Sequence, residues 1–72
     1  MAYQTFRFEA LRSDYDAVMN ILRDYINQGR LVIEDDSVYI QGGEWIAHFA
    51  VLCTEELYDV IRSKLVRDWL VI

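Results

Sequence analysis

The sequence predicts a small α+β domain, a ferredoxin-like two-layer sandwich with both helices on one face of an antiparallel sheet and elements in the order β-α-β-β-α-β. Three observations lead to this prediction. Apolar residues alternate along the first segment, they recur at helical spacing in two later segments, and a Gly-Gly pair separates two stretches rich in β-branched and aromatic residues.

The first strand and the first helix follow from a change of period. In YQTFRFEAL the apolar side chains at even positions face one side, and the other side carries Thr5, Arg7 and Glu9. The next segment has apolar residues at three- and four-residue spacing, as an amphipathic helix does. Ser13 is its predicted N-cap, and Gly29 suits the left-handed position after the last turn.

A β-hairpin is predicted next. Gly42-Gly43 forms its two-residue turn, because glycine adopts positive φ angles at little steric cost. Gln41 then faces Glu44, and Val38 faces Ala47. Residues of one parity on the two strands therefore share one side of the hairpin.

The strand before the turn needs an irregularity. Leu31 and Ile33 have the wrong parity to join Val38 on the apolar side unless one extra residue is inserted between Ile33 and Val38. We expect a β-bulge at Asp35-Asp36, which would restore these side chains and Ile40 to one face. The alternative is a second tight turn at the same two residues, which would give three short strands.

The second helix runs through TEELYDVIRSKLVRD. Thr54 is its predicted N-cap, acids occupy its first turn and cations lie near its end, so each charge is where the helix dipole favours it. Trp69–Ile72 either forms a last strand or continues this helix. The runner-up order, β-α-β-β-β-α, drops the last strand and splits the second one.

Length and composition predict one domain, residues 1–72. A chain of 72 residues is near the lower limit for independent folding. The single cysteine, Cys53, excludes an intramolecular disulfide, and no ligand cluster predicts a metal or another cofactor. The sequence is nevertheless 54% apolar. That composition indicates either a very efficient core or apolar surface shared with another chain, and we favour the second.

The net charge and the apolar pattern limit the classes of partner that we expect. Twelve acids against seven bases give a formal net charge of −5. We expect no direct nucleic-acid binding, because phosphate contacts need clustered Lys and Arg. We expect no membrane partner either, since no stretch approaches the roughly 20 apolar residues of a span. An unpaired cysteine and the absence of a signal-peptide pattern favour the cytoplasm. A basic protein partner fits the charge.

We expect no catalytic site and therefore no enzyme. Acid pairs lie in the first turn of each helix, where the helix dipole accounts for them. His48 and Cys53 stand five residues apart on one strand and face opposite sides, which excludes a nucleophile pair within a single chain. The segment EDDSVYIQGGEW lacks both the alternating ligands of a calcium loop and the helix that follows the glycines of a phosphate loop.

The predicted interaction surface is the sheet face that points away from the helices, which we call the open face. A solvated sheet face is normally polar, whereas this one is half apolar, and apolar surface marks interfaces. Its candidate contact residues are Val32, Tyr39, Ile46, His48 and Leu52. A second candidate region is the acidic edge, formed by Glu34, Asp35, Asp36 and Glu44.

Two functions fit these features. The first is a small acidic protein-interaction module of the inhibitor or immunity type, without catalysis, that binds a basic protein, for example one that handles nucleic acid. It would use the open face or the acidic edge. The alternative is a homodimeric regulatory domain with a small ligand at the subunit boundary.

Overall fold

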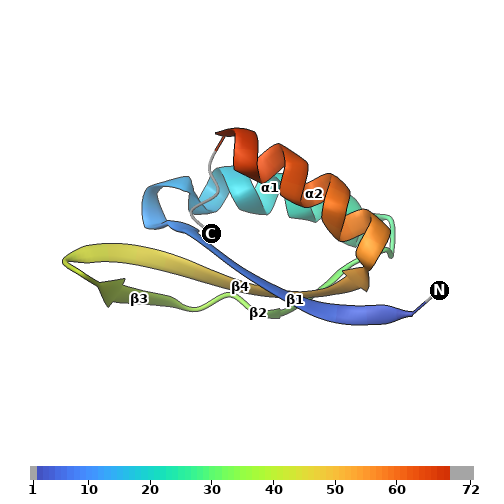
Figure 1. Ribbon diagram of the computed structural model, residues 1–72, viewed down its shortest axis with the longest axis horizontal. Coiled ribbons are helices and arrows are strands. Elements are labelled where there is room, and N and C mark those ends of the chain that lie inside the picture. Colours follow the sequence, from blue (N-terminus) through green and yellow to red (C-terminus); the bar gives the residue numbers. More distant parts are fainter. Residues whose placement is uncertain (1, 69–72) are drawn as a thin grey trace.

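The computed structural model describes the backbone of residues 2–68 and the side chains of residues 2–65. Its elements are shown in Figure 1: β1 (Tyr3–Leu11), the 3₁₀ turn η1 (Arg12–Asp14), α1 (Tyr15–Asn27), β2 (Val32–Asp35), β3 (Val38–Gln41), β4 (Glu44–Thr54) and α2 (Glu55–Asp68).

The sheet is built around one strand, β4. All nine residues of β1 pair with one side of β4, and β2 and β3 pair with the other side. All three pairings are antiparallel. Both helices cover the same face of this sheet (Figure 1). The predicted α+β class is therefore confirmed, as an antiparallel sheet of four strands with two helices.

The described elements follow the order β-α-β-β-β-α, because the second strand is split into β2 and β3. The split belongs to the runner-up order. The last strand predicted at residues 69–72 lies outside the described residues.

The split between β2 and β3 contains a β-bulge. Both strands run antiparallel to β4 and therefore in the same direction, which excludes the tight turn. Ile33 faces Val51 but Asp35 faces Ala50, so Glu34 is the extra residue. The bulge lies one position earlier than predicted. It brings Ile33 of β2 and both Val38 and Ile40 of β3 to the helix side of the sheet, as expected.

The hairpin turn between β3 and β4 is confirmed. Gln41 faces Glu44, and Ile40 faces Trp45. Gly42 and Gly43 have φ angles of 61° and 85°, both in the left-handed region that favours glycine.

The core lies between the helices and the helix side of the sheet. Phe8 of β1 faces Phe49 of β4, and their buried rings stack with centroids 5.1 Å apart. Phe6 stacks on Tyr58 of α2 at 4.2 Å. The buried helix residues are Val18 and Leu22 of α1 and Leu57, Ile61 and Leu65 of α2.

Three of the predicted helix-end features are confirmed, and one, the Ser13 cap, is wrong. Ser13 is not the N-cap of α1, because the chain first makes the turn η1, so that Asp14 precedes the helix without a side-chain cap. Gly29 has a φ of 73°, as a C-terminal glycine should. Thr54 Oγ1 accepts the Leu57 N–H at 3.2 Å and caps α2, whose first turn carries the expected acids. No helix among the described residues is long and apolar enough to cross a membrane.

The turn glycines give a stability prediction. Gly43→Val should lower the free energy of unfolding by about 1–2 kcal/mol, the cost of placing a side chain in the left-handed region. The cost is purely conformational, since no atom lies within 4 Å of the position that a Cβ would take.

Urea denaturation measures this change. Gly42→Asn is the matched control, because asparagine tolerates positive φ, and it should cost clearly less. Equal losses for the two variants would show that the turn does not hold these angles.

Candidate protein-interaction surface

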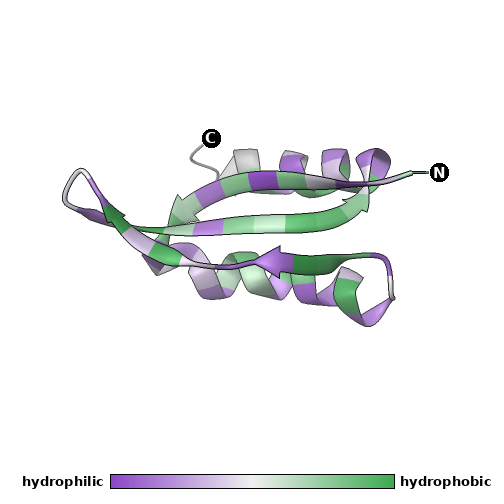
Figure 2. Ribbon diagram, turned by 90° about the horizontal axis from the view of Figure 1, so that it is seen from below, coloured by the Kyte–Doolittle hydropathy of each residue, from purple (hydrophilic) through white to green (hydrophobic). Residues whose placement is uncertain are grey.

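The open face consists of the residues that the sequence places there. Thr5 faces Leu52 and Arg7 faces Ala50 across the β1–β4 pairing, and Val32 faces Leu52 from the other edge. Figure 2 shows this face from below, with hydrophilic and hydrophobic residues interspersed along the strands. The strand register therefore agrees with the predicted membership of this face.

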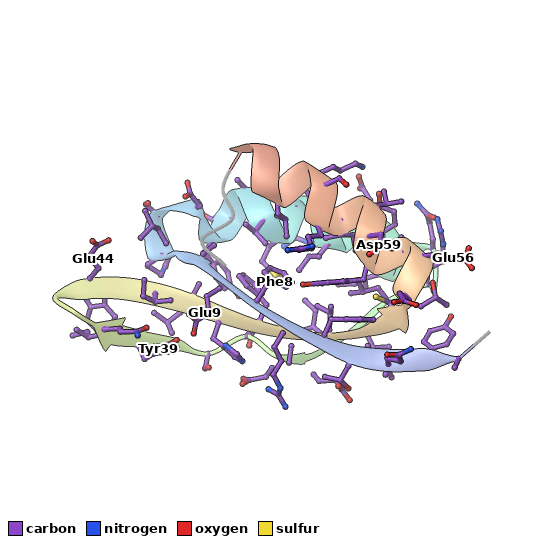
Figure 3. The ribbon with its side chains drawn as sticks, viewed as in Figure 1. Phe8, Glu9, Tyr39, Glu44, Glu56 and Asp59 are labelled. Carbon is purple, nitrogen blue, oxygen red and sulfur yellow. The ribbon has the colours of Figure 1, made fainter. Side chains whose placement is uncertain are left out.

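Polar side chains of the two edges meet across the central strand. Thr5 Oγ1 of β1 donates to Glu34 Oε1 of β2 at 2.5 Å. Further along, the Tyr39 hydroxyl of β3 donates to Glu9 Oε2 of β1 (Figure 3). The same oxygen lies 3.6 Å from His48 Nδ1 on β4. Since β4 separates β1 from β2 and β3, each hydrogen bond bridges over it.

Two apolar residues of β4 on this face are buried between the edge strands. Ile46 is only 8% exposed and Ala50 only 1%, although both belong to the open face. Val32, at 55%, is the most exposed of the predicted apolar contacts, while Leu52 is half-buried. The open face therefore offers less apolar surface than its sequence pattern indicates.

The acidic edge is divided between the two faces of the sheet. Glu34 bonds to Thr5 on the open face, and Asp35 belongs there by its register with Ala50. Asp36 instead accepts a hydrogen bond from the Tyr15 hydroxyl of α1 at 2.9 Å, on the helix side. That bond, with partial desolvation and the carboxylate charge, raises the pKa of Tyr15 above its usual 10.0. The remaining acid, Glu44, begins β4 beside the hairpin turn.

Among the residues that the structure describes, three exposed apolar side chains lie together on the helix side of the hairpin. They are Val38, Ile40 and Trp45, which are 38%, 59% and 56% exposed, and we call this group the hairpin patch. Ile40 and Trp45 face each other, and Val38 faces the buried Ala47 next to them. The patch therefore continues the core-facing side of the sheet beyond the core.

A difference in length leaves the hairpin patch uncovered by the described helices. The 13 residues of α1 span about 20 Å, whereas the 11 residues of β4 span about 36 Å. Figure 1 shows the hairpin extending past the end of α1 at which the helix begins. A hollow lies beside the patch, lined by Leu11, Arg12, Ser13, Glu44 and Trp45.

Sequence reasoning missed the hairpin patch because parity assigns its residues to the core side. The signal that could have found it is the unequal length of the predicted helix and strand, which parity does not take into account.

The two groups considered for catalysis are separated as predicted. Cys53 is buried on the helix side, and burial raises the pKa of its thiol. His48 lies on the open face beside Glu9. Among the described residues, no three His, Cys, Asp or Glu side chains gather as a metal site requires.

Comparison with protein-family models, with curated proteins and with solved structures finds no match to this chain.

The contact between Tyr15 and Asp36 gives a spectroscopic prediction. Asp36→Asn should lower the pKa of Tyr15 toward 10.0, because it removes the carboxylate charge that accepts a hydrogen bond from the protonated hydroxyl. A pH titration of ¹³C-labelled tyrosine, followed by NMR, measures the change.

Asp16→Asn is the control, since Asp16 acts on Tyr15 only through its charge and as the last of the contributing causes. It should move the pKa less than Asp36→Asn does. A larger effect of Asp16→Asn would mean that Tyr15 is not bonded to Asp36 in solution.

Proposed function

We propose that this protein is a protein-interaction module of the inhibitor or immunity type, which binds a basic protein and catalyses no reaction. The hairpin patch carries the proposal. It forms the centre of the contact surface, and the acids near it supply the charge that selects the partner. Val32, Leu52 and Glu34 on the open face extend the surface around the β2–β3 edge.

The composition of the hairpin patch supports a binding role. Exposed apolar side chains that lie next to one another, with polar residues around them, are typical of interaction sites. Tryptophan is also enriched among the residues that dominate binding energy, and Trp45 is more than half exposed. Exposing these side chains has no benefit for the fold itself, because burying them would stabilise it by about 25 cal/mol per Å².

The surrounding charge supports a basic partner. Glu44 lies at the end of the hairpin, and Figure 3 shows its side chain pointing away from the sheet. Asp36 holds its carboxylate on the same side of the sheet as the patch, through Tyr15. With a formal net charge of −5, the whole molecule attracts cations, and this attraction accelerates association with a basic protein.

A random peptide library displayed on phage tests the proposed patch. Peptides selected on the wild-type protein should be rich in Lys, Arg and apolar residues. Their binding should weaken by about tenfold or more for Ile40→Glu, which puts a charge in the centre of the patch. Biolayer interferometry with single selected peptides measures the affinities.

Val60→Glu is the matched control for the peptide experiment. Val60 is 47% exposed on α2 and lies outside the patch, so this variant should bind as the wild type does. Circular dichroism checks that both variants fold. Peptides that bind Ile40→Glu with unchanged affinity would refute the hairpin patch as the contact surface.

A charge reversal tests the role of the acids. Asp36→Lys combined with Glu44→Lys should weaken the binding of the basic peptides and remove most of its dependence on salt, because fewer opposite charges meet in the complex. Affinities measured at low and high salt show the effect.

The control for charge is Asp24→Lys combined with Asp59→Lys. It changes the net charge equally, but these two exposed acids lie on the helices. If both double variants lose the same affinity, only the net charge matters and the acids near the hairpin have no specific role.

A further inference from the structure

The outer edge of β1 is long and regular. Among the described residues only β4 pairs with β1, so all nine residues of the strand border a free edge. Its pairing with β4 runs from Tyr3 to Leu11 without a bulge, and the strand has neither proline nor lysine. Proteins use bulges, prolines and lysines to keep edge strands from pairing with other chains. Because β1 has none of the three, it is a template for another strand.

We infer that two copies of this chain pair through β1, antiparallel and centred on Phe8, so that Arg7 of each copy faces Glu9 of the other. The result is one continuous sheet with all four helices on the same face. This inference is independent of the proposed function, because it uses the opposite edge of the sheet from the hairpin patch.

The requirement that the faces match limits the register. Odd-numbered residues of β1 lie on the open face and even-numbered ones on the helix side, so odd positions must face odd positions. Centring the pair on Arg7 would place this cation directly against its own copy. Centring it on Phe8 brings Arg7 opposite Glu9 twice, and opposite charges across a strand pair are favourable whereas like charges are not.

Both charged side chains have the capacity for this contact. Arg7 is exposed, and among the described residues it has no acidic partner within 4 Å. Glu9 uses one oxygen, Oε2, for both Tyr39 and His48. Its other oxygen, Oε1, has no partner among the described residues and can accept from a guanidinium group.

The helices also fit the two-fold axis that relates the two copies and passes beside Phe8. Tyr58 of α2 stacks on Phe6 and also contacts the Phe8 ring, so the middle of α2 lies close to the proposed axis. α2 contacts both β1 and β4. A helix above the junction of β1 and β4 lies one strand spacing from the axis, and therefore two spacings, about 10 Å, from its copy. This is a normal packing distance between helices.

The side of α2 that would meet its copy carries one charge of each sign. Lys64 bonds to Tyr25 of α1 and marks the opposite side of the helix. At 100° per residue, Glu55 and Arg62 lie on the side away from α1. In an antiparallel pair of helices Glu55 of one copy lies toward Arg62 of the other, so the helix layer complements itself as the strands do.

Residues 69–72 are the competing occupant of this edge, since the ferredoxin-like order would place a last strand there. A strand of four residues covers less than half of the nine positions of β1 and leaves Arg7 without an acidic partner. The second copy accounts for more of the edge and for its charges.

Sedimentation equilibrium of the full chain over a wide concentration range tests the inference. The wild type should dimerise. Arg7→Glu should raise the dissociation constant by about tenfold or more, because two Glu–Glu pairs replace two ion pairs. The double variant Arg7→Glu/Glu9→Arg restores opposite charges in this register only, so it should recover most of the lost affinity. Arg23→Glu is the control, with the same change of charge on α1, and should dimerise like the wild type.

Three results would overturn the inference. One is a wild type that stays monomeric at all concentrations, and another is a dimer that Arg7→Glu leaves unchanged. The third is a monomeric full chain that dimerises only when residues 69–72 are removed, which would assign the edge to the chain's own end. Circular dichroism confirms folding of each variant, and a folded charge-swap variant that fails to recover affinity would likewise refute the proposed register.

Discussion

The structure depends on the hydrogen bonding of one strand. β1, β2 and β3 each pair only with β4 among the described residues, so no other strand pair holds the sheet together. The sequence of β4 suits this position, because six of its residues are buried and two of these are alanines. Ala47 faces the helices, and Ala50 lies under the polar side chains of the open face. Small residues at the centre allow the helices on one side, and the side chains of the edge strands on the other, to close over it.

A mismatch of lengths then decides where apolar surface is left. β4 must be long enough to pair with β1 along its full length and with β2 and β3 in succession, whereas the described helices cover only part of it. The uncovered part is the hairpin. Its exposed side chains follow from the same period-two alternation that builds the core, continued beyond the end of the helix layer. The hairpin patch is therefore a consequence of how the sheet is assembled, and it needs no separate structural device.

Local rules made most of the fold predictable, and non-local geometry explains the rest. The parity of Ile40, the two turn glycines and the Thr54 cap depend only on neighbours in sequence, and each was predicted correctly. Ile33 lies on the predicted side, but the bulge that places it there is at Glu34, one position earlier than predicted. Ser13 was misassigned because the exit of the chain from β1 takes a 3₁₀ turn before α1 begins. The contact between Tyr39 and Glu9 was missed because these residues are thirty apart in sequence and meet only across β4. The exposed hairpin patch was missed because an alternating pattern gives the side on which a residue lies but not whether anything covers that side.

The two faces of the sheet consequently exchange the roles that their sequence patterns indicate. The open face has the composition of an interface, yet Ile46 and Ala50 are buried there and polar side chains of the edge strands bond across it, which makes it an unpromising surface for face-to-face packing. The helix side has the composition of a core, yet its far end is exposed at Trp45. The contacts that we propose with other chains therefore use the ends and edges of the sheet. A two-fold axis at the edge formed by β1 would leave both hairpins free, at opposite ends of the joined sheet, because β3 lies on the other side of β4 from β1. Self-association and partner binding would therefore use different parts of the molecule and could occur together.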